Sequence, residues 1–341
     1  MKIGVGISGG IDSLFCSVLL KEKGYDVVGV FGVFTDELRK VKDIIRDKFK
    51  SLNIECIFLD LIDEFKKYVI DIFVDYYLKG FTPNPCCICN RYIKFGVLKQ
   101  RIMDLGFDYF ATGHYAKLIN QDNQIKLYRG VDRAKDQSYF LSLVPKDSFK
   151  DVKLPLGGYK KNEIRDKLKE KNITPAITSE SQEICFIKEN YRDFLKKMGK
   201  ELPGPGKIVG IGGDELGIHK GLFNYTIGQR RGLGIPYREP LYVIHKDLDQ
   251  NILVVGTKDD LLHNRCVVGD VNCLVPMDNW PEEIEIQVNY NMKPKKALWE
   301  KKGEVVHVVF KEKIPRPSPG QICCFYSGNM VLGGGIIKNE R

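Results

Sequence analysis

A glycine-rich turn near the N-terminus constrains this chain more than any other stretch. Residues 2–5 form a short, mostly apolar run that predicts a strand, and the apolar residues after position 13 recur at helical spacing. Glycines let backbone N–H groups approach a phosphate closely, and the start of a helix adds positive dipole. The turn therefore predicts a phosphate-binding loop, and Asp12 within it could hold a Mg²⁺ ion on the phosphates. The residues of this loop are Gly6, Ile7, Ser8, Gly9, Gly10, Ile11, Asp12 and Ser13.

Two common phosphate motifs fit this turn poorly. Residues 4–9 match the dinucleotide pattern Gly-x-Gly-x-x-Gly, but the first glycine comes too early to follow a finished strand. A Walker A loop needs Gly-Lys followed by Ser or Thr, which the turn does not contain. The remaining pattern, Ser-Gly-Gly-Ile-Asp-Ser, resembles the PP-loop of ATP pyrophosphatases. That resemblance implies cleavage of ATP to AMP and pyrophosphate, with the AMP used to activate a substrate oxygen.

Strand and helix patterns alternate along the first part of the chain. Strand patterns at 26–34 and 54–60 are separated by a helical pattern at 38–52, and another helical pattern covers 65–76. This β-α-β-α order predicts an α/β fold with a parallel sheet, whose ligands bind at the carboxyl ends of the strands.

The segments after residue 80 do not continue this alternation of strands and helices. Two prolines predict a loop over residues 81–91, and a further strand is expected at 107–112. A hairpin is expected around 121–123, a charged helix over 160–171 and a short strand over 181–187.

The 341 residues exceed what one hydrophobic core usually serves. Glycine and proline become frequent after residue 202, and the strand patterns become short. We expect a PP-loop domain over 1–199, a small central β-rich domain over 200–264 and a C-terminal β-barrel over 265–341. The predicted barrel strands are 266–275, 284–290, 305–310, 322–326 and 330–333.

Charge and cysteine content narrow the class of protein. The 53 Lys and Arg against 44 Asp and Glu give a net charge of +9, which suits either a polyanionic partner such as nucleic acid or an ordinary solvated surface. Met1 leads directly into a strand, and the longest apolar runs fall short of the roughly 20 residues of a membrane span, so a cytoplasmic protein without membrane contact is expected. Ten cysteines in such a chain indicate reduced thiols, metal binding or catalysis.

Cys86 and Cys89 form a C-x-x-C pair just before a predicted helix. A position at the helix N-terminus, beside Arg91 and Lys94, should lower the pKa of Cys89. A buried turn cysteine and half of a zinc site are the alternatives, although structural zinc usually needs a second ligand pair. Cys185, from a distant segment, would supply a second thiol to the same pocket.

A series of motifs, in the same order over nearly the full length, resembles the bacterial tRNA-specific 2-thiouridylases. These motifs are Ser-Gly-Gly-Ile-Asp-Ser at 8–13, Thr-Pro-Asn-Pro at 82–85 with Cys89-Asn90, Ala-Thr-Gly-His-Tyr-Ala at 111–116, Lys-Asp-Gln-Ser-Tyr-Phe-Leu at 135–141, Ser-Gln-Glu-Ile-Cys-Phe at 181–186, Tyr-Thr-Ile-Gly-Gln-Arg-Arg-Gly-Leu-Gly at 225–234 and Pro-Gly-Gln at 319–321.

The resemblance implies ATP-dependent thiolation of C2 of the wobble uridine in tRNA, by an AMP-forming sulfurtransferase. It implies that residues 6–13 bind ATP together with Gly32 and Gly113, and that Asp12, Cys89 and Cys185 are catalytic. Cys185 would carry a persulfide loaded by a sulfur-donor protein, and Cys89 would release the sulfur. The central domain would contact RNA. The residues implied to meet the target base or the tRNA are Asn84, Pro85, Cys86, His114, Lys135, Asp136, Gln137, Tyr290, Asn291 and Gln321.

One departure from the family leaves the sulfur chemistry open. The familiar form carries Asp at the position of Cys86, so this chain brings three thiols, with Cys89 and Cys185, to one pocket. Three cysteines could hold a [4Fe–4S] cluster with one open iron that binds sulfide, which we favour slightly. In the rival persulfide scheme Cys86 is a bystander, and the other two thiols cycle through a disulfide.

Three other functions are compatible with parts of the pattern. An amidating AMP-forming synthetase would use the PP-loop but would need no convergent cysteines. A non-enzymatic iron–sulfur RNA sensor would have no use for residues 8–13. A thiolase acting on another RNA pyrimidine would use both, and Asn289 and Asn291, which stand where the family is usually more basic, leave the exact RNA target open.

Overall fold

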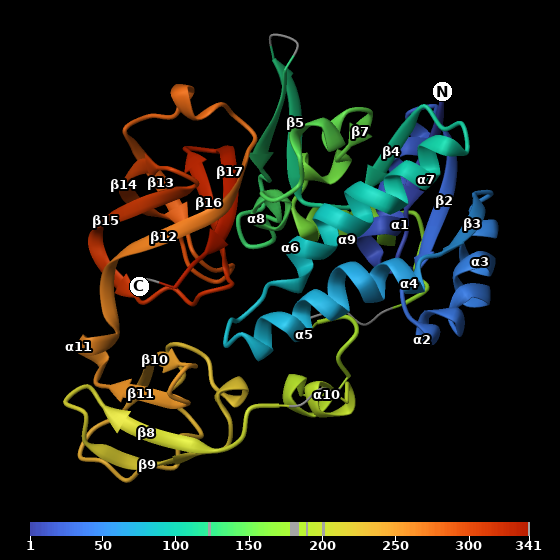
Figure 1. The fold of residues 1–341 in the computed structure, drawn as a ribbon. Coiled ribbons are helices and arrows are strands. Elements are labelled where there is room, and N and C mark those ends of the chain that lie inside the picture. The colour runs from blue at the N-terminus through green and yellow to red at the C-terminus, as the bar shows by residue number, and fades with distance from the viewer. Residues whose placement is uncertain (122–123, 178–183, 189, 200–201, 340–341) are drawn as a thin grey trace.

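The computed structural model describes residues 1–121, 124–177, 184–188, 190–199 and 202–339. The chain forms a parallel-sheet domain, a small central β domain and a closed β-barrel, which confirms the expected fold class (Figure 1). The barrel packs beside the first domain, and the central domain lies below the barrel in this view. The domain limits expected after residues 199 and 264 remain predictions, and residues 200–201 lie outside the described residues.

The sheet of the first domain has the strand order β3-β2-β1-β4-β7, with every neighbouring pair parallel. Ile3 and Val5 on the central strand are fully buried, as expected for a sheet covered on both faces. The strand order reverses between β1 and β4, which makes the carboxyl end of β1 the natural ligand site. The strands are β1 (Lys2–Gly6), β2 (Asp26–Val33), β3 (Glu55–Asp60), β4 (Tyr109–Thr112) and β7 (Val152–Lys153).

Helices surround this sheet at the places where the apolar periodicity predicts them. The expected helix at 38–52 is divided into two by residues 40–41, and the helix expected at 160–171 is confirmed. The α-helices are α1 (Ile11–Glu22), α2 (Asp36–Arg39), α3 (Lys42–Lys50), α4 (Ile62–Phe65), α5 (Asp71–Leu78), α6 (Pro85–Cys89), α7 (Lys99–Asp104), α8 (Ser138–Leu141), α9 (Lys161–Glu170) and α10 (Tyr191–Lys197). Two π-helical segments, η1 (Lys66–Ile70) and η2 (Asn90–Leu98), join α4 to α5 and α6 to α7, and short 3₁₀ turns are η3 (Lys146–Phe149) and η4 (Pro155–Gly158).

The loop predicted over residues 81–91 is wrong from Pro85 onward. Pro85 occupies the first helical position of α6, where its missing N–H is no loss, and the Asn84 side chain caps the helix by accepting the Cys87 N–H at 3.2 Å. The prolines therefore start a helix here.

The strand predicted over residues 181–187 is also wrong in its described part. Residues 184–187 form a turn closed by a hydrogen bond from the Ile187 N–H to the Ile184 carbonyl, 2.9 Å long. The Phe186 ring packs edge-on against Phe73 and Phe65 in an aromatic cluster. Burial of this ring explains the apolar end of the motif without a sheet partner, while residues 181–183 lie outside the described residues.

The central domain is a four-stranded sheet with the order β10-β11-β8-β9. Its small core contains Val243, Leu253 and Val255, all fully buried. The elements are β8 (Gly206–Gly210), β9 (Glu215–His219), η5 (Leu222–Asn224), β10 (Tyr242–Asp247), β11 (Ile252–Gly256) and α11 (Lys258–Leu261).

The C-terminal barrel closes through the pairing of β12 with β17. Sequence analysis missed β14, since its lysine-rich sequence shows no apolar alternation and only Ala297 on it is buried. The barrel strands, in spatial order, are β12 (Leu262–Cys273), β15 (Val305–Pro315), β14 (Lys295–Lys302), β13 (Glu283–Gln287), β16 (Ile322–Ser327) and β17 (Met330–Ile337), and η6 (Met277–Asn279) follows β12 in the chain.

The first domain and the barrel are joined by a strand pairing and by a common hydrophobic core. The predicted hairpin of β5 (Ala116–Gln121) and β6 (Gln124–Arg129) is confirmed, and β6 pairs with β17 of the barrel through Tyr128 and Met330. Barrel side chains such as Ile322 and Val331 belong to the same hydrophobic core as the helices around Cys89. No helix in the described part of the chain is long and apolar enough to cross a bilayer.

Candidate active site

The glycine-rich turn lies between the carboxyl end of β1 and the start of α1. Gly9 has a φ of 81°, and a Cβ there would lie 3.0 Å from the Ile177 side chain, so glycine suits this position. The Ser13 hydroxyl accepts the Ser8 N–H at 3.1 Å and lies 3.1 Å from the Gly10 carbonyl, to which it donates. Gly10, the N-cap of α1, has no side chain to cap the first-turn N–H groups, an arrangement that favours anion binding.

The two glycines expected to line the nucleotide site lie at the same edge of the sheet. Gly113 follows β4, and a Cβ there would lie 3.0 Å from the Asp12 carbonyl carbon, so the two segments are in close contact. Gly32 lies near the end of β2, where a Cβ would meet the Phe34 ring at 2.5 Å. The strand ends thus bring both glycines toward the edge that carries the loop.

The Asp12 carboxylate is held by Tyr115, from the motif at 111–116, and by Lys161, which sequence analysis did not single out. The Lys161 ammonium lies 2.7 Å from each of its oxygens, and the Tyr115 hydroxyl donates to Oδ1 at 2.5 Å. Lys161 begins a charged helix far along the chain, and no local pattern distinguishes it from the other lysines there.

Cys86 and Cys89 lie on α6, and Cys185 lies on the turn at residues 184–187. Cys86 and Cys185 are exposed, whereas Cys89 is 8% exposed. Desolvation raises the pKa of Cys89 to about 12, with smaller contributions from Cys185 and Cys86, and Lys94 opposes the shift. Cys86 also raises the pKa of Cys185, so segments distant in sequence bring these thiols to one region of the molecule.

The expected lowering of the Cys89 pKa is wrong for this structure. Cys89 is the last residue of α6 and is followed directly by η2, so it lies away from any helix N-terminus. Desolvation also raises the pKa of Cys185 and of Cys86, above all other causes. All three thiols are therefore protonated near neutral pH in this arrangement.

The three thiols are not grouped closely enough to bind a single metal ion. Among the described residues, no three His, Cys, Asp or Glu side chains are grouped closely enough to hold a metal ion. Cys86, Cys89 and Cys185 all belong to that part of the chain. The cysteine sulfurs of a [4Fe–4S] cluster lie farther apart than the ligands of a single ion, so the expected three-cysteine cluster site stays a prediction.

His114 and Asn84 lie close to this thiol region. His114 is buried at 8% exposure, and its Nδ1 lies 2.7 Å from the Thr112 hydroxyl. Burial lowers the pKa of His114 well below its usual value, and Lys94, which also acts on the cysteines, lowers it further. Asn84 and Pro85 position the start of α6, immediately before Cys86.

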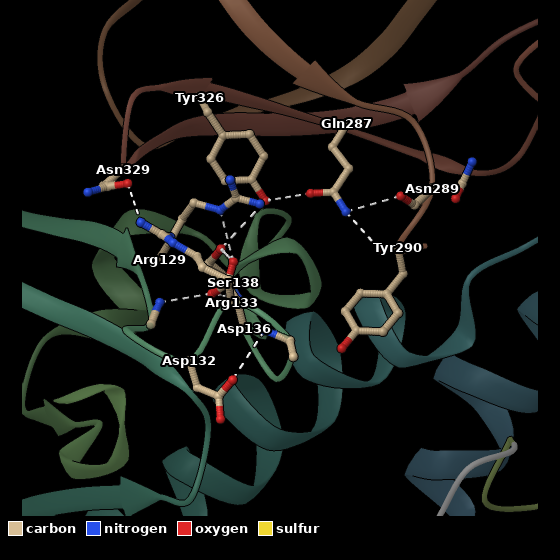
Figure 2. A network of polar contacts seen from close by, with 12 residues as sticks. Arg129, Asp132, Arg133, Asp136, Ser138, Gln287, Asn289, Tyr290, Tyr326 and Asn329 are labelled. Carbon is tan, nitrogen blue, oxygen red and sulfur yellow. Dashed lines mark hydrogen bonds and ion pairs between the residues drawn. The ribbon is translucent and has the colours of Figure 1, made fainter. Parts of the chain in front are cut away.

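Asp136 is the centre of a polar network between the first domain and the barrel (Figure 2). Its buried carboxylate accepts hydrogen bonds from Arg129 Nε at 3.0 Å, the Gly130 N–H at 2.9 Å and the Ser138 hydroxyl at 2.9 Å. The Arg129 guanidinium lies 4.6 Å from the centre of the Tyr326 ring on β16. These contacts give Asp136 a structural role, and its expected contact with tRNA stays a prediction.

Of the remaining residues expected to contact tRNA, two form hydrogen bonds within the protein and three are exposed. Gln137 Oε1 accepts the Tyr115 N–H at 3.0 Å, and Gln321 Nε2 donates to the Thr82 carbonyl at 2.9 Å, so both bind the protein's own backbone. Lys135, Tyr290 and Asn291 are exposed. The Tyr290 ring packs on Phe140, with the ring centres 4.5 Å apart.

Comparison with family models covers almost the whole chain. A tRNA methyl transferase HUP domain model matches residues 1–189, a tRNA methyl transferase PRC-barrel domain model matches 192–257, and an aminomethyltransferase beta-barrel domain model matches 263–337. The tRNA-specific 2-thiouridylase MnmA of Nitratidesulfovibrio vulgaris strain DP4 is 43% identical, with 99% of each chain covered. The chain belongs to the tRNA-specific 2-thiouridylase family.

Other members of the 2-thiouridylase family agree in length. MnmA of Carboxydothermus hydrogenoformans is 41% identical over 99% of this chain and 98% of its own, and MnmA of Rickettsia rickettsii strain Sheila Smith is 40% identical over 99% and 97%. Among solved structures, the U34-tRNA thiolase NcsA from Methanococcus maripaludis with its [4Fe-4S] cluster is 20% identical, covers 58% of this chain and 65% of its own, and has a TM-score of 0.36, too low to support an argument.

Two buried histidines are expected to make the stability of this 2-thiouridylase depend on pH. Like His114, His219 is buried with a lowered pKa, and its Nδ1 accepts the Gly221 N–H at 3.0 Å. A histidine with a lowered folded pKa contributes stability above its unfolded pKa of about 6.5, and this is lost as pH falls toward the folded pKa. We expect the free energy of unfolding to fall below pH 6.5 by up to about 1.4 kcal/mol per pH unit for each histidine.

Denaturant unfolding at a series of pH values checks this expectation. A His114→Asn/His219→Asn variant should show a shallower pH dependence than the parent, whatever its absolute stability. Replacing His245, which is exposed, should leave the slope unchanged. Equal slopes for the parent and the double variant would show that other groups cause the acid sensitivity.

Proposed function

We propose that this protein is an AMP-forming tRNA-uridine 2-sulfurtransferase that replaces the C2 oxygen of the wobble uridine with sulfur. The observation that carries this proposal is that Cys185, from a distant segment, lies near enough to Cys89 to raise its pKa, in a protein whose first strand ends in a PP-loop. The 2-thiouridylase relatives, matched over their full length, support tRNA as the substrate. A tRNA-modifying enzyme of this kind acts in the cytoplasm.

The ATP step solves a leaving-group problem. A carbonyl oxygen on a pyrimidine leaves poorly, but transfer of AMP from ATP to that oxygen creates a good leaving group and releases pyrophosphate. The loop at residues 6–13 would hold the phosphates with backbone N–H groups, together with Gly32 and Gly113. Asp12 is the residue that would hold Mg²⁺, which would stabilise the charge that develops on the phosphates.

We infer that sulfur reaches the uridine through a persulfide on Cys185. This exposed thiol is accessible to a sulfur-donor protein, whereas Cys89 is buried beside it. Attack of the Cys89 thiolate on the Cys185 persulfide would form a Cys89–Cys185 disulfide and release hydrosulfide. Hydrosulfide then attacks C2, AMP leaves with the oxygen, and an external dithiol reduces the disulfide. Loss of a proton from Cys89 needs a change in its buried surroundings, which binding of tRNA would supply.

The rival sulfur carrier is a [4Fe–4S] cluster on Cys86, Cys89 and Cys185. A direct measurement decides between the two. Iron and acid-labile sulfide are measured in protein reconstituted anaerobically. Protein that thiolates tRNA without either component excludes the cluster, whereas activity that depends on both excludes the persulfide route.

The tRNA would lie over the exposed residues between the first domain and the barrel. Lys135, Tyr290 and Asn291 are exposed there, and Cys86 is exposed at the start of α6. The net charge of +9 favours a polyanion through contacts that do not depend on sequence. Asn84, Pro85 and Cys86 would contact the target base. The residues that would hold this surface in shape through hydrogen bonds within the protein are His114, Asp136, Gln137 and Gln321.

Nucleoside mass spectrometry of tRNA from cells that lack this protein tests the proposal. We expect 2-thiouridine to disappear from tRNA and to return when the gene is restored. Persistence of 2-thiouridine with loss of a different thionucleoside would point to another RNA pyrimidine. Unchanged thionucleosides, with ATP cleavage that depends on ammonia, would replace the proposal with an amidating synthetase.

A further inference from the structure

Lys161 reaches the PP-loop from a part of the chain that carries none of the family motifs described above. It is the first residue of α9, and its ammonium lies 2.7 Å from both carboxylate oxygens of Asp12. We propose that Lys161 is a positioning residue for the nucleoside triphosphate. It neutralises the PP-loop carboxylate, so that the anionic triphosphate can enter the loop without repulsion. This inference rests on the ATP use in the proposed function.

The exposure of the two partners supports this role. The Lys161 side chain is 7% exposed and that of Asp12 is 35% exposed. The ammonium is therefore buried in the protein, and the carboxylate is the partner that faces solvent. The Tyr115 hydroxyl donates to Asp12 Oδ1 at 2.5 Å, which fixes the carboxylate further. A buried charge is tolerated when it is paired in this way.

The backbone around both donors is also held in place. The Lys161 N–H donates to Asp132 Oδ2 at 2.9 Å, and the Tyr115 N–H donates to Gln137 Oε1 at 3.0 Å. Residues 132–137 thus hold both side chains that contact Asp12. Because the backbone at Lys161 is fixed by its hydrogen bond to Asp132, the fold itself places the lysine against the Asp12 carboxylate.

The charge balance gives a specific consequence. A carboxylate without a counter-ion beside a triphosphate repels it, and the repulsion is strong in a partly buried site. Either Lys161 or a divalent cation can remove that repulsion. Loss of Lys161 should therefore weaken ATP binding most when Mg²⁺ is absent, which a general loss of structure would not do.

The experiment measures ATP affinity by isothermal titration calorimetry, with the full-length protein, in EDTA and in Mg²⁺. We expect Lys161→Met to raise the Kd for ATP at least about tenfold in EDTA, because the uncompensated Asp12 carboxylate then repels the triphosphate, and by a smaller factor in Mg²⁺. The control is Lys167→Met, which removes the same charge from an exposed position on the same helix. Its Kd should match that of the parent in both buffers.

A second variant keeps the test decisive if Lys161→Met folds poorly. Asp12→Asn removes the carboxylate and leaves the lysine, so ATP should bind in EDTA at least as tightly as it binds the parent protein. Asp12→Asn/Lys161→Met should recover affinity in EDTA relative to Lys161→Met. Equal losses with and without Mg²⁺, or weaker ATP binding by Asp12→Asn in EDTA, would overturn the proposal. A parent protein that binds no ATP in either buffer would instead contradict the proposed function.

Discussion

Replacing Cys185 with serine is expected to abolish thiolation of tRNA while adenylation of the uridine, with release of pyrophosphate from ATP, still occurs. Serine cannot carry a sulfane sulfur, and loss of a covalent nucleophile typically lowers turnover by about a thousandfold or more. The PP-loop lies on other elements and keeps its contacts in this variant. The measurement is incorporation of radiolabelled sulfur into tRNA, together with RNA-dependent release of pyrophosphate.

Matched variants identify the sulfur route. Cys273→Ser removes another exposed thiol from the barrel and should retain full activity. Cys86→Asp restores the residue that the family usually carries, and it should remain active in a persulfide mechanism but lose activity if the three thiols hold a cluster. Thiolation that survives in both Cys185→Ser and Cys89→Ser would exclude a sulfur relay through these residues.

Replacing Asp136 with alanine is expected to lower the free energy of unfolding by about 3–5 kcal/mol, as for one partner of a buried ion pair. The variant would leave the Arg129 guanidinium, whose side chain is 17% exposed, without its carboxylate. It would also remove the acceptor for the Gly130 N–H and the Ser138 hydroxyl, which are both buried. Urea unfolding followed by circular dichroism measures the loss.

The neighbouring Lys135 provides the control, because it is exposed. Lys135→Ala should change the free energy of unfolding by less than about 0.5 kcal/mol, as surface substitutions do, and weaken tRNA binding. A stable Asp136→Ala protein that no longer binds tRNA would instead assign Asp136 to the RNA interface.

The fold could be predicted because its signals are local and repeated. Apolar runs such as residues 2–5 and 26–34 alternate with helical periodicity, and the glycine turn at residues 6–13 marks the ligand end of the first strand. Strand β14 escaped prediction because its outward residues are mostly lysine, and its inward packing depends on neighbours distant in sequence.

The chemistry of the site was less predictable, because it depends on burial. Pro85 was interpreted as part of a loop, although proline is equally suited to the first position of a helix. The same error placed Cys89 at a helix start and lowered its expected pKa, whereas desolvation raises it. Lys161 could not be found at all, since its partner Asp12 is brought to it only by the folded sheet.

The turn at Gly320 has a consequence for how this enzyme can be divided or recombined. Gly320 has a φ of 90°, and a Cβ there would lie 2.8 Å from Phe81 Cβ; its neighbour Gln321 donates to the Thr82 carbonyl. The barrel thus contacts the segment that leads into α6, and barrel side chains complete the hydrophobic core that packs against this helix. The first domain therefore depends on the barrel for its packing, and a fragment that ends before the barrel would lose part of the hydrophobic core around Cys89.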